Sequence, residues 1–206
     1  MYNRAKLKLK AKEKIKGHIG IFLLCFLLYL GIVLPLSLLQ DWIEQKHPLT
    51  GVLFSFIAGC IQSLLVFGVA VFTLYFVRNN QTSLSYLFAG FQQQYWLKVL
   101  LVGLLKGICV LAGMLLFIVP GIIIALGLSQ TDYILYDNPE MSVVDILRKS
   151  WNMMNGYKGK LLVLELSFIG WGLLCILTLG LAMIYVFPYY QTTRTLFYEF
   201  LKEVQG

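Results

Sequence analysis

Three ionisable residues lie inside long apolar runs of the sequence: Lys106, Asp132 and Glu165. A charged side chain is costly in hydrocarbon, so such residues usually face the interior of a helix bundle or a water-filled cavity. Two roles are open to them. They can pair with one another and hold helices together, or they can relay protons or ions through a membrane. Structural ion pairs are the commoner use, and the pairing interpretation is therefore favoured over the relay.

The neighbours of these residues indicate that they point inward. Lys106 follows Gly103 by three residues in "GLLKG", and small residues at this spacing let helices approach closely. Asp132 shares a helical face with Ser129. All three charges fall in the same half of the predicted membrane. We therefore expect an intramembrane polar cluster that contains Lys106, Asp132, Glu165 and Ser129, with Gln62 and Arg194 as further candidates.

No pattern of catalysis or metal binding accompanies these charges. The four cysteines each fall inside an apolar run, with no Cys-x-x-Cys pair and no His or carboxylate at metal-ligand spacing. The two histidines are isolated, and the sequence contains no Ser-His-Asp, G-x-S-x-G or P-loop pattern. We expect no enzymatic activity, no metal site and no cofactor.

The composition is that of a membrane protein. Of 206 residues, 59% are hydrophobic and 13% are charged, against roughly 45–50% and 25% in ordinary soluble domains. Several apolar runs reach the roughly 18 residues that cross a bilayer core. A net charge of +7 would suggest nucleic acid in a soluble protein. Here the basic residues sit at the ends of the apolar runs, so membrane topology explains them and no nucleic-acid partner is expected.

The fold class expected is an all-α integral membrane protein with about six transmembrane helices arranged as three hairpins. The first three predicted spans cover residues 19–39, 51–77 and 97–119. A break at Pro120-Gly121 precedes a fourth span that ends near residue 136, and a fifth covers 161–186. Pro188 predicts the turn of the third hairpin. Residues 188–204 are long enough for a sixth helix, although whether it crosses stays open.

The spans also suggest an internal repeat within a single membrane domain. Its three units, 1–80, 81–137 and 138–206, each combine an amphipathic interfacial helix with a hairpin. The junctions "KIKGHIG", "QQQYWLK" and "MMNGYKG" each place His or an aromatic residue before a span. Trp96, Trp151 and Tyr157 are the expected interfacial anchors. The alternative is that the three units are unrelated, since any membrane protein alternates apolar and polar stretches.

The distribution of basic residues predicts the orientation. Seven precede His18 and four lie in 148–160, whereas the loop of the first hairpin contains Lys46 alone. By the positive-inside rule, the termini and the interfacial helices should be cytoplasmic, in a multi-pass protein of the cytoplasmic membrane. An odd number of spans, with the last segment lying flat, would instead leave the C-terminus near the outer face. A basic amphipathic helix at the N-terminus should bind anionic lipids. A membrane-protein partner or a homo-oligomer is also possible.

Four segments carry a family likeness: "NRAKLKLKAKEKIKGH", "IVPGIIIALGLSQTDYILYDNP", "LSFIGW" and "FPYYQTTRTLFYEFL". On these segments the chain resembles the bacterial integral-membrane family known as domain of unknown function 975, common in Gram-positive bacteria. The resemblance covers nearly the whole chain, and Asp132 is a departure from it. It implies a multi-spanning protein of the cytoplasmic membrane, and it implies no catalytic residues.

Two functions of different classes follow. The first hypothesis is a non-enzymatic accessory or structural protein that binds other membrane components. The rival is a small transporter, or a peptide-export or immunity factor, that uses Lys106, Asp132 and Glu165. Neutral substitutions such as Lys106→Met and Glu165→Gln should spare a scaffold and inactivate a transporter.

Overall fold

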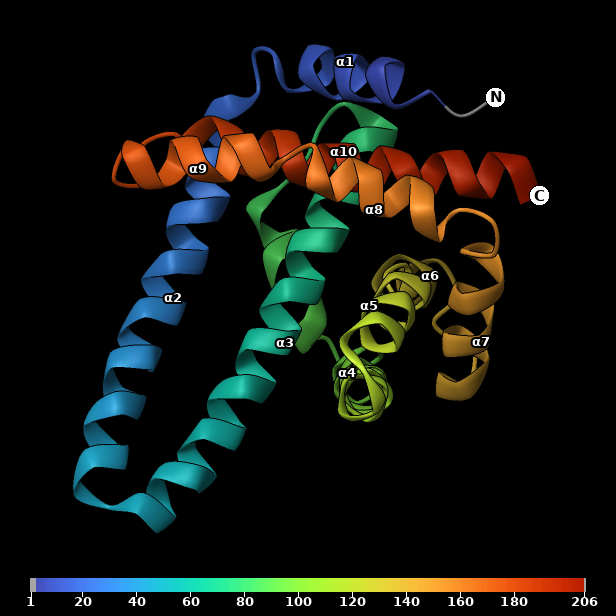
Figure 1. Cartoon of the computed structure of the whole chain (residues 1–206). Coiled ribbons are helices and arrows are strands. Elements are labelled where there is room, and N and C mark those ends of the chain that lie inside the picture. Colours follow the sequence, from blue (N-terminus) through green and yellow to red (C-terminus); the bar gives the residue numbers. More distant parts are fainter. Residues whose placement is uncertain (1–2, 206) are drawn as a thin grey trace.

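A computed structural model describes residues 3–205, and this part of the chain is helical with no β-strand (Figure 1). Several helix starts follow local sequence signals: the Ser83 side chain caps the segment 84–91, and Pro48 is the first residue of the helix 48–79. The elements in chain order are α1 (Arg4–Ile15), α2 (Ile19–Lys46), α3 (Pro48–Asn79), the 3-10 helix η1 (Leu84–Phe91), α4 (Trp96–Leu116), α5 (Ile118–Gly127), α6 (Thr131–Asp137), α7 (Val143–Met153), α8 (Lys158–Leu166), α9 (Ile169–Leu177) and α10 (Met183–Gln205).

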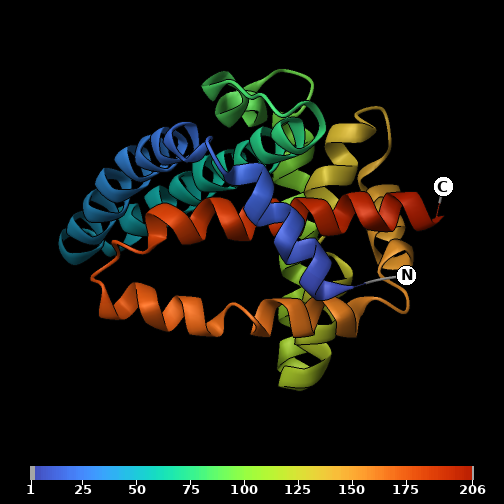
Figure 2. The ribbon, with the colours of Figure 1, turned by 90° about the horizontal axis from the view of Figure 1, so that it is seen from above.

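Three antiparallel helix pairs extend from a common base, and we call them the first arm (α2–α3), the second arm (α4–α5) and the third arm (α9 with the start of α10). They point in different directions. In Figure 1 the first arm descends, the third arm extends to the left, and the second arm is seen nearly end on. Figure 2 shows the second arm from the side, with its turn projecting away from the other two. The structure is therefore a splayed set of arms rather than a parallel bundle.

The core lies where the arms meet. Phe22 of α2 packs edge-to-face against Phe72 and Phe76 of α3, with ring centroids 5.2 and 4.9 Å apart. Tyr133 of α6 stacks on Tyr198 of α10 at 5.0 Å. Beyond this core the arms expose large apolar side chains, as is usual for lipid-facing helices and not for a soluble protein.

Five helical segments are long and apolar enough to cross a membrane: Ile19–Lys46, Pro48–Asn79, Trp96–Leu116, Ile118–Asp137 and Lys158–Leu177. They correspond to the first five predicted spans. Within the described residues α10 is not among them, and its sequence is polar over much of its length, with Gln191, Thr192, Thr193 and Arg194 at its centre. The six-span layout stays a prediction.

The first hairpin turn is tighter than the sequence suggested. We expected a polar loop over residues 40–50, but α2 continues to Lys46 and α3 begins at Pro48, with His47 alone between them. The polar residues of this turn therefore lie on helix ends. Pro48 suits the start of α3 because the first N–H groups of a helix have no partner within it.

Pro120 does not break the helix where we predicted. The break falls at Phe117, whose backbone is extended, and Pro120 lies in the first turn of α5. A proline ring clashes with the carbonyl group four residues earlier but is tolerated in a first turn. The chain therefore turns before the proline. Gly121 is buried against α4, where a Cβ would lie 3.0 Å from the backbone nitrogen of Met114, so it allows the two helices to pack closely.

The prediction that Pro188 marks the third hairpin turn is wrong. Residues 178–182 form that turn, and Pro188 lies buried inside α10, which begins at Met183. Gly180, at φ +90°, supplies the reversal. A proline in a helix removes one backbone hydrogen bond and can still be accommodated among packed neighbours.

Two predicted spans are each built from two shorter helices. The fourth is divided into α5 and α6 by residues 128–130, and the fifth into α8 and α9 by Ser167 and Phe168. The segment predicted as an interfacial helix at 82–91 forms η1. Three residues make one turn of a 3-10 helix, so Leu84, Leu87 and Gly90 share the face packed on α3, while Phe88 and Phe91 are exposed.

The repeat junctions share local features. His18, Tyr95 and Tyr157 are the N-cap residues of α2, α4 and α8. Gly17 and Gly156, which precede two of them, both have positive φ, of 86° and 75°. Such a backbone favours glycine and ends the preceding helix before the next begins. These likenesses support the predicted repeat, which stays a prediction.

Candidate functional site

Glu165 lies in a polar contact between α8 and α10. Its carboxylate pairs with the Arg194 side chain, with Nε and Oε1 3.3 Å apart, and accepts a hydrogen bond of 2.6 Å from the Tyr190 hydroxyl. The Arg194 side chain is 30% exposed. Asp132 of α6 also acts electrostatically on the Arg194 guanidinium. Arg194, a further candidate in the sequence, is thus the ion-pair partner of Glu165.

The other predicted members lie apart from this pair. The Ser129 hydroxyl donates to the Leu126 carbonyl at 2.7 Å and accepts from the Gln130 amide at 2.8 Å. Lys106 is half-buried in α4, and none of residues 3–205 forms an ion pair with it. Gln62 is exposed on α3. The structure pairs Glu165 with Arg194, and within residues 3–205 it joins neither Asp132 nor Lys106 to that pair by an ion pair.

A second charged network ties the ends of three helices together. Arg78, at the end of α3, binds both carboxylate oxygens of Asp137 at 2.7 and 2.8 Å and also contacts Glu199 of α10 at 2.7 Å. Lys202 and the Tyr198 hydroxyl both donate to Asp137, at 2.8 and 2.9 Å. Sequence reasoning missed this network because each residue was explained as the polar end of a span. The sequence did contain one indication of the network: Arg78 and Asp137 have opposite charges, and each directly follows an apolar run.

A buried serine forms hydrogen bonds with the backbone at the break between α5 and α6. Ser150 of α7 is fully buried; its hydroxyl donates to the Gly127 carbonyl at 2.9 Å and accepts from the Gln130 N–H at 3.2 Å. Trp151 covers Gly127 so closely that a Cβ there would lie 2.4 Å from the indole. These contacts fix α7 against the second arm.

The N-terminal helix α1 lies across α8 and α10 (Figure 2). Lys8 donates to the carbonyl and hydroxyl oxygens of Ser167, at 3.4 and 3.1 Å, and its ammonium lies 4.4 Å from the centre of the Phe168 ring. A cation there suits the carbonyl end of α8. Burial, with the nearby charge of Arg4, lowers the pKa of Lys8 from its ordinary value. Burial, with the charge of Lys10, similarly lowers the pKa of Lys14, which bonds to Asn80.

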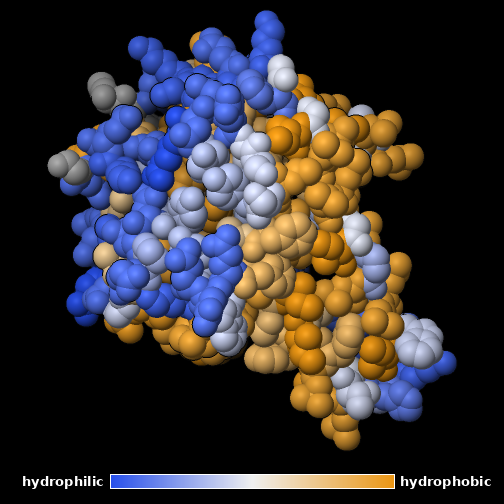
Figure 3. Space-filling model, turned by 180° about the vertical axis from the view of Figure 1, so that it is seen from behind, coloured by the Kyte–Doolittle hydropathy of each residue, from blue (hydrophilic) through white to orange (hydrophobic). Residues whose placement is uncertain are grey.

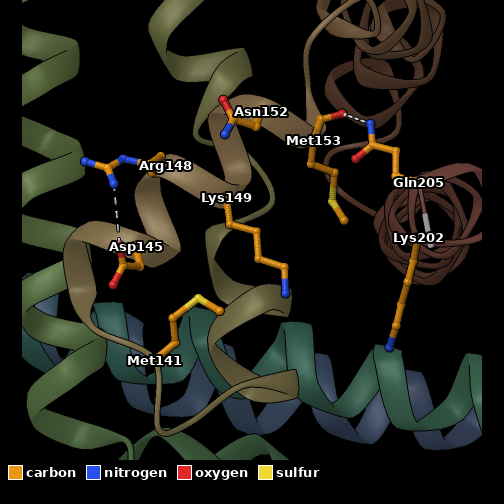
Figure 4. A pocket seen from close by; sticks show the side chains of 8 residues that line it. All are labelled: Met141, Asp145, Arg148, Lys149, Asn152, Met153, Lys202 and Gln205. Atoms are coloured by element: carbon orange, nitrogen blue, oxygen red, sulfur yellow. Dashed lines mark hydrogen bonds and ion pairs between the residues drawn. The ribbon is translucent and has the colours of Figure 1, made fainter.

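A basic groove of about 510 Å³ opens between α7 and the end of α10 (Figure 4). Its lining includes three cations and one acid: Arg148, Lys149, Lys202 and Asp145. Arg148 and Asp145 approach to 3.9 Å, and both are mostly exposed. The charge of this groove suits an anionic group, because three cationic side chains line it against one carboxylate.

The interfacial anchors occupy helix starts or packing positions. Trp96 is the first residue of α4 and is 44% exposed. Trp151 is partly covered by Lys158, whose ammonium lies 3.5 Å from the ring centre. The Tyr157 ring contacts the Phe200 ring with centroids 5.9 Å apart. Trp151 and Tyr157 thus pack α7 and α8 against their neighbours.

Hydrophilic and hydrophobic residues separate to opposite sides of the molecule (Figure 3). We call the hydrophilic side the polar face; it is formed by the exposed residues of α1, of α7 and of the end of α10, residues 199–205. The family described as "Protein of unknown function (DUF975)" matches residues 1–126 and 110–205. The chain belongs to this family. No curated protein and no solved structure shows significant similarity to this DUF975 chain.

The described part of the DUF975 chain pairs charges between helices and exposes apolar side chains on its arms. Among the described residues, no group of three or more His, Cys, Asp or Glu side chains is arranged to hold a metal ion. Cys25 and Cys175 are buried thiols, and Cys109 is exposed on the second arm. The features that stand out are two charged networks between helices, a basic groove and three apolar arms.

Proposed function

We propose that this DUF975 chain is a non-enzymatic accessory protein of the cytoplasmic membrane. The observation that carries the proposal is how its inter-helix charges are used: Arg78 joins α3 to α6 and α10, and Arg194 joins α10 to α8. Charges employed in this way stabilise an arrangement of helices. They hold the arms in place and present the polar face outside the bilayer.

The polar face is the proposed binding surface, and it lies on the cytoplasmic side. Its helix α1 carries seven basic residues with Lys16 included, and the groove beside α7 adds three more cations. Basic residues collect on the cytoplasmic side of membrane proteins. Each Lys or Arg near an anionic surface contributes about 1 kcal/mol of attraction. Anionic lipid headgroups, or acidic segments of membrane-associated proteins, are the components that such a surface would bind.

The test is purification of tagged protein from membranes in mild detergent, with mass spectrometry of the retained lipids and proteins. The variant Arg148→Gln/Lys149→Gln removes two groove cations whose polar contacts go to Asp145 and Asn138, outside the arms. Lys46→Gln at the tip of the first arm is the control. At about 1 kcal/mol for each charge, the double variant should retain anionic components roughly 30-fold less well. If the double variant retained anionic components as well as wild type does, the polar face would not be their binding surface.

One observation favours a transporter as the second candidate: Lys106 is half-buried in α4 and has no ion-pair partner in the described part of the chain. Lys106→Met and Glu165→Gln separate the two functions. An accessory protein that still folds should keep its membrane partners in both variants. A transporter should lose its activity with expression unchanged, and wild type would then purify with a small molecule or peptide and no stoichiometric partner.

A further inference from the structure

The tips of the three arms differ in polarity. The tip of the first arm is polar and carries Asp41, Glu44 and Lys46, and it forms a separate hydrophilic patch at the far end of an apolar arm in Figure 3. Between this patch and the base, residues 19–39 of α2 are apolar except for Ser37. Those 21 residues are about 31 Å long, close to the roughly 30 Å of a hydrocarbon core. The first arm therefore matches a complete crossing.

The third arm is too short for a crossing. Lys8 of α1, a helix of the polar face, binds Ser167 at the break between α8 and α9. Only the nine residues of α9 extend beyond that contact toward the tip. Nine residues of α-helix span about 14 Å, which is half of a hydrocarbon core. Although Lys158–Leu177 is long enough to span, its first half is thus tied to the polar face.

The second arm is limited in the same way. Trp151 and Ser150 of α7, another helix of the polar face, contact Gly127 at the end of α5. Beyond them only the ten residues of α5 reach toward the tip, a length of about 15 Å. Two arms of different sequence therefore project from the polar face by nearly the same distance.

Both short arms end in apolar tips. Leu115, Phe117 and Ile118 are 80%, 76% and 73% exposed, and Leu177 and Leu179 are 80% and 95% exposed. No charged residue occurs in 107–131 or 166–193. A tip in water beyond the far leaflet would not be expected to expose only apolar side chains, whereas a tip surrounded by acyl chains would.

The backbone of the third tip is also suited to hydrocarbon, where unpaired polar groups are costly. Each N–H from Thr178 to Val186 is hydrogen-bonded within the turn, including that of Ala182, which donates to the Thr178 hydroxyl at 3.1 Å. Leu179 has φ +50°, a position where glycine is usual and leucine is strained. A leucine held there places a large apolar side chain at the end of the arm.

We propose that the second and third arms enter only the leaflet next to the polar face, with their tips among the acyl chains near the bilayer midplane, while the first arm crosses completely. The bound partner of these two tips is lipid hydrocarbon. Because the arms diverge (Figures 1 and 2), all three cannot stand upright in one bilayer, and a tilted arm reaches less deeply. The proposal concerns insertion depth and holds whether or not the polar face binds anionic components.

The test uses the full chain with its four cysteines replaced and one cysteine introduced at a time. Val119→Cys and Leu177→Cys probe the two short tips at exposed positions, and Gln45→Cys is the matched control at the polar tip. A membrane-impermeant maleimide is applied to intact cells and to inverted membrane vesicles. The Gln45→Cys variant should react from the side opposite the polar face. The other two should react from neither side until detergent is added.

A second measurement shows whether lipid or protein surrounds the two tips. A fluorophore on each introduced cysteine is reconstituted with lipids that are brominated either near the headgroup or near the end of the acyl chain. Quenching at positions 119 and 177 should be strongest with bromine near the chain end. Labelling of either position at the rate of the control would show a complete crossing. Strongest quenching near the headgroup would show an arm lying at the surface, and no quenching by either lipid would show a tip covered by protein; each result overturns the proposal.

Discussion

At Ser150, one buried hydroxyl group satisfies two backbone groups of the second arm, the Gly127 carbonyl and the Gln130 N–H. These groups are left open because the helix stops between α5 and α6. An unpaired buried polar group costs about 1–3 kcal/mol. The serine therefore allows the helix to break without that cost.

Ser150→Ala should lower the free energy of unfolding by about 1–3 kcal/mol, because the two backbone groups would lose their partner. Thermal unfolding of the detergent-solubilised protein measures the change. Ser37→Ala is the control, since the Ser37 hydroxyl is exposed and bonds only to Leu34 within its own helix. Equal effects of the two substitutions would contradict the role given to Ser150.

The contact between η1 and α3 depends on two glycines. A Cβ on Gly68 would lie 1.8 Å from the Leu87 carbonyl oxygen, and one on Gly90 would lie 2.3 Å from that of Leu64. Backbone carbonyls cannot move aside as a flexible side chain can. The packing of η1 along α3 is thus possible only with hydrogen atoms at these positions.

Gly68→Ala should destabilise the protein by about 1–3 kcal/mol or more, because η1 must move away from α3. Gly59→Ala, in the same helix but with no atom within 4 Å of the new Cβ, should be neutral or stabilising by about 0.5–1 kcal/mol. Thermal unfolding of both variants in one detergent gives the comparison. Limited proteolysis within 80–95 should become faster in the Gly68→Ala variant alone.

The Arg78 network acts on the whole molecule because it joins the base of the first arm to α6 and to the C-terminal part of α10. Its guanidinium binds Asp137 through two parallel hydrogen bonds and also reaches Glu199, so α3, α6 and α10 meet at one residue. The Asp137 side chain is only 10% exposed and is also held by Lys202. Removal of one partner leaves the other charge partly desolvated, which is the costly outcome.

Arg78→Met and Asp137→Asn should each destabilise the protein, and the double variant should lose less than the sum of the two. A coupling of about 0.5–3 kcal/mol is expected for groups in direct contact. Arg78→Lys should not restore full stability, because an ammonium cannot make the paired contact. Additive losses in unfolding experiments would show that the two residues do not depend on each other.

The sequence by itself determined the family, through its characteristic segments, and the approximate extents of five helices long and apolar enough to span a membrane, because the length of an apolar run is a local property. It also predicted a polar cluster of Lys106, Asp132 and Glu165. Lys106 seemed the natural partner of the two carboxylates, since charge type and depth were the only guides. The cation that pairs with Glu165 is instead Arg194, on α10.

Only the tertiary structure decided where the helices break and which charges meet. Pro120 and Pro188 look alike in sequence, yet one lies in a first turn and the other inside a helix, because the turns form at Phe117 and at residues 178–182. The depth of each arm depends on contacts of α1 and α7 with residues far along the chain, Ser167 and Gly127. Such contacts are set by packing between helices, and no local pattern encodes them.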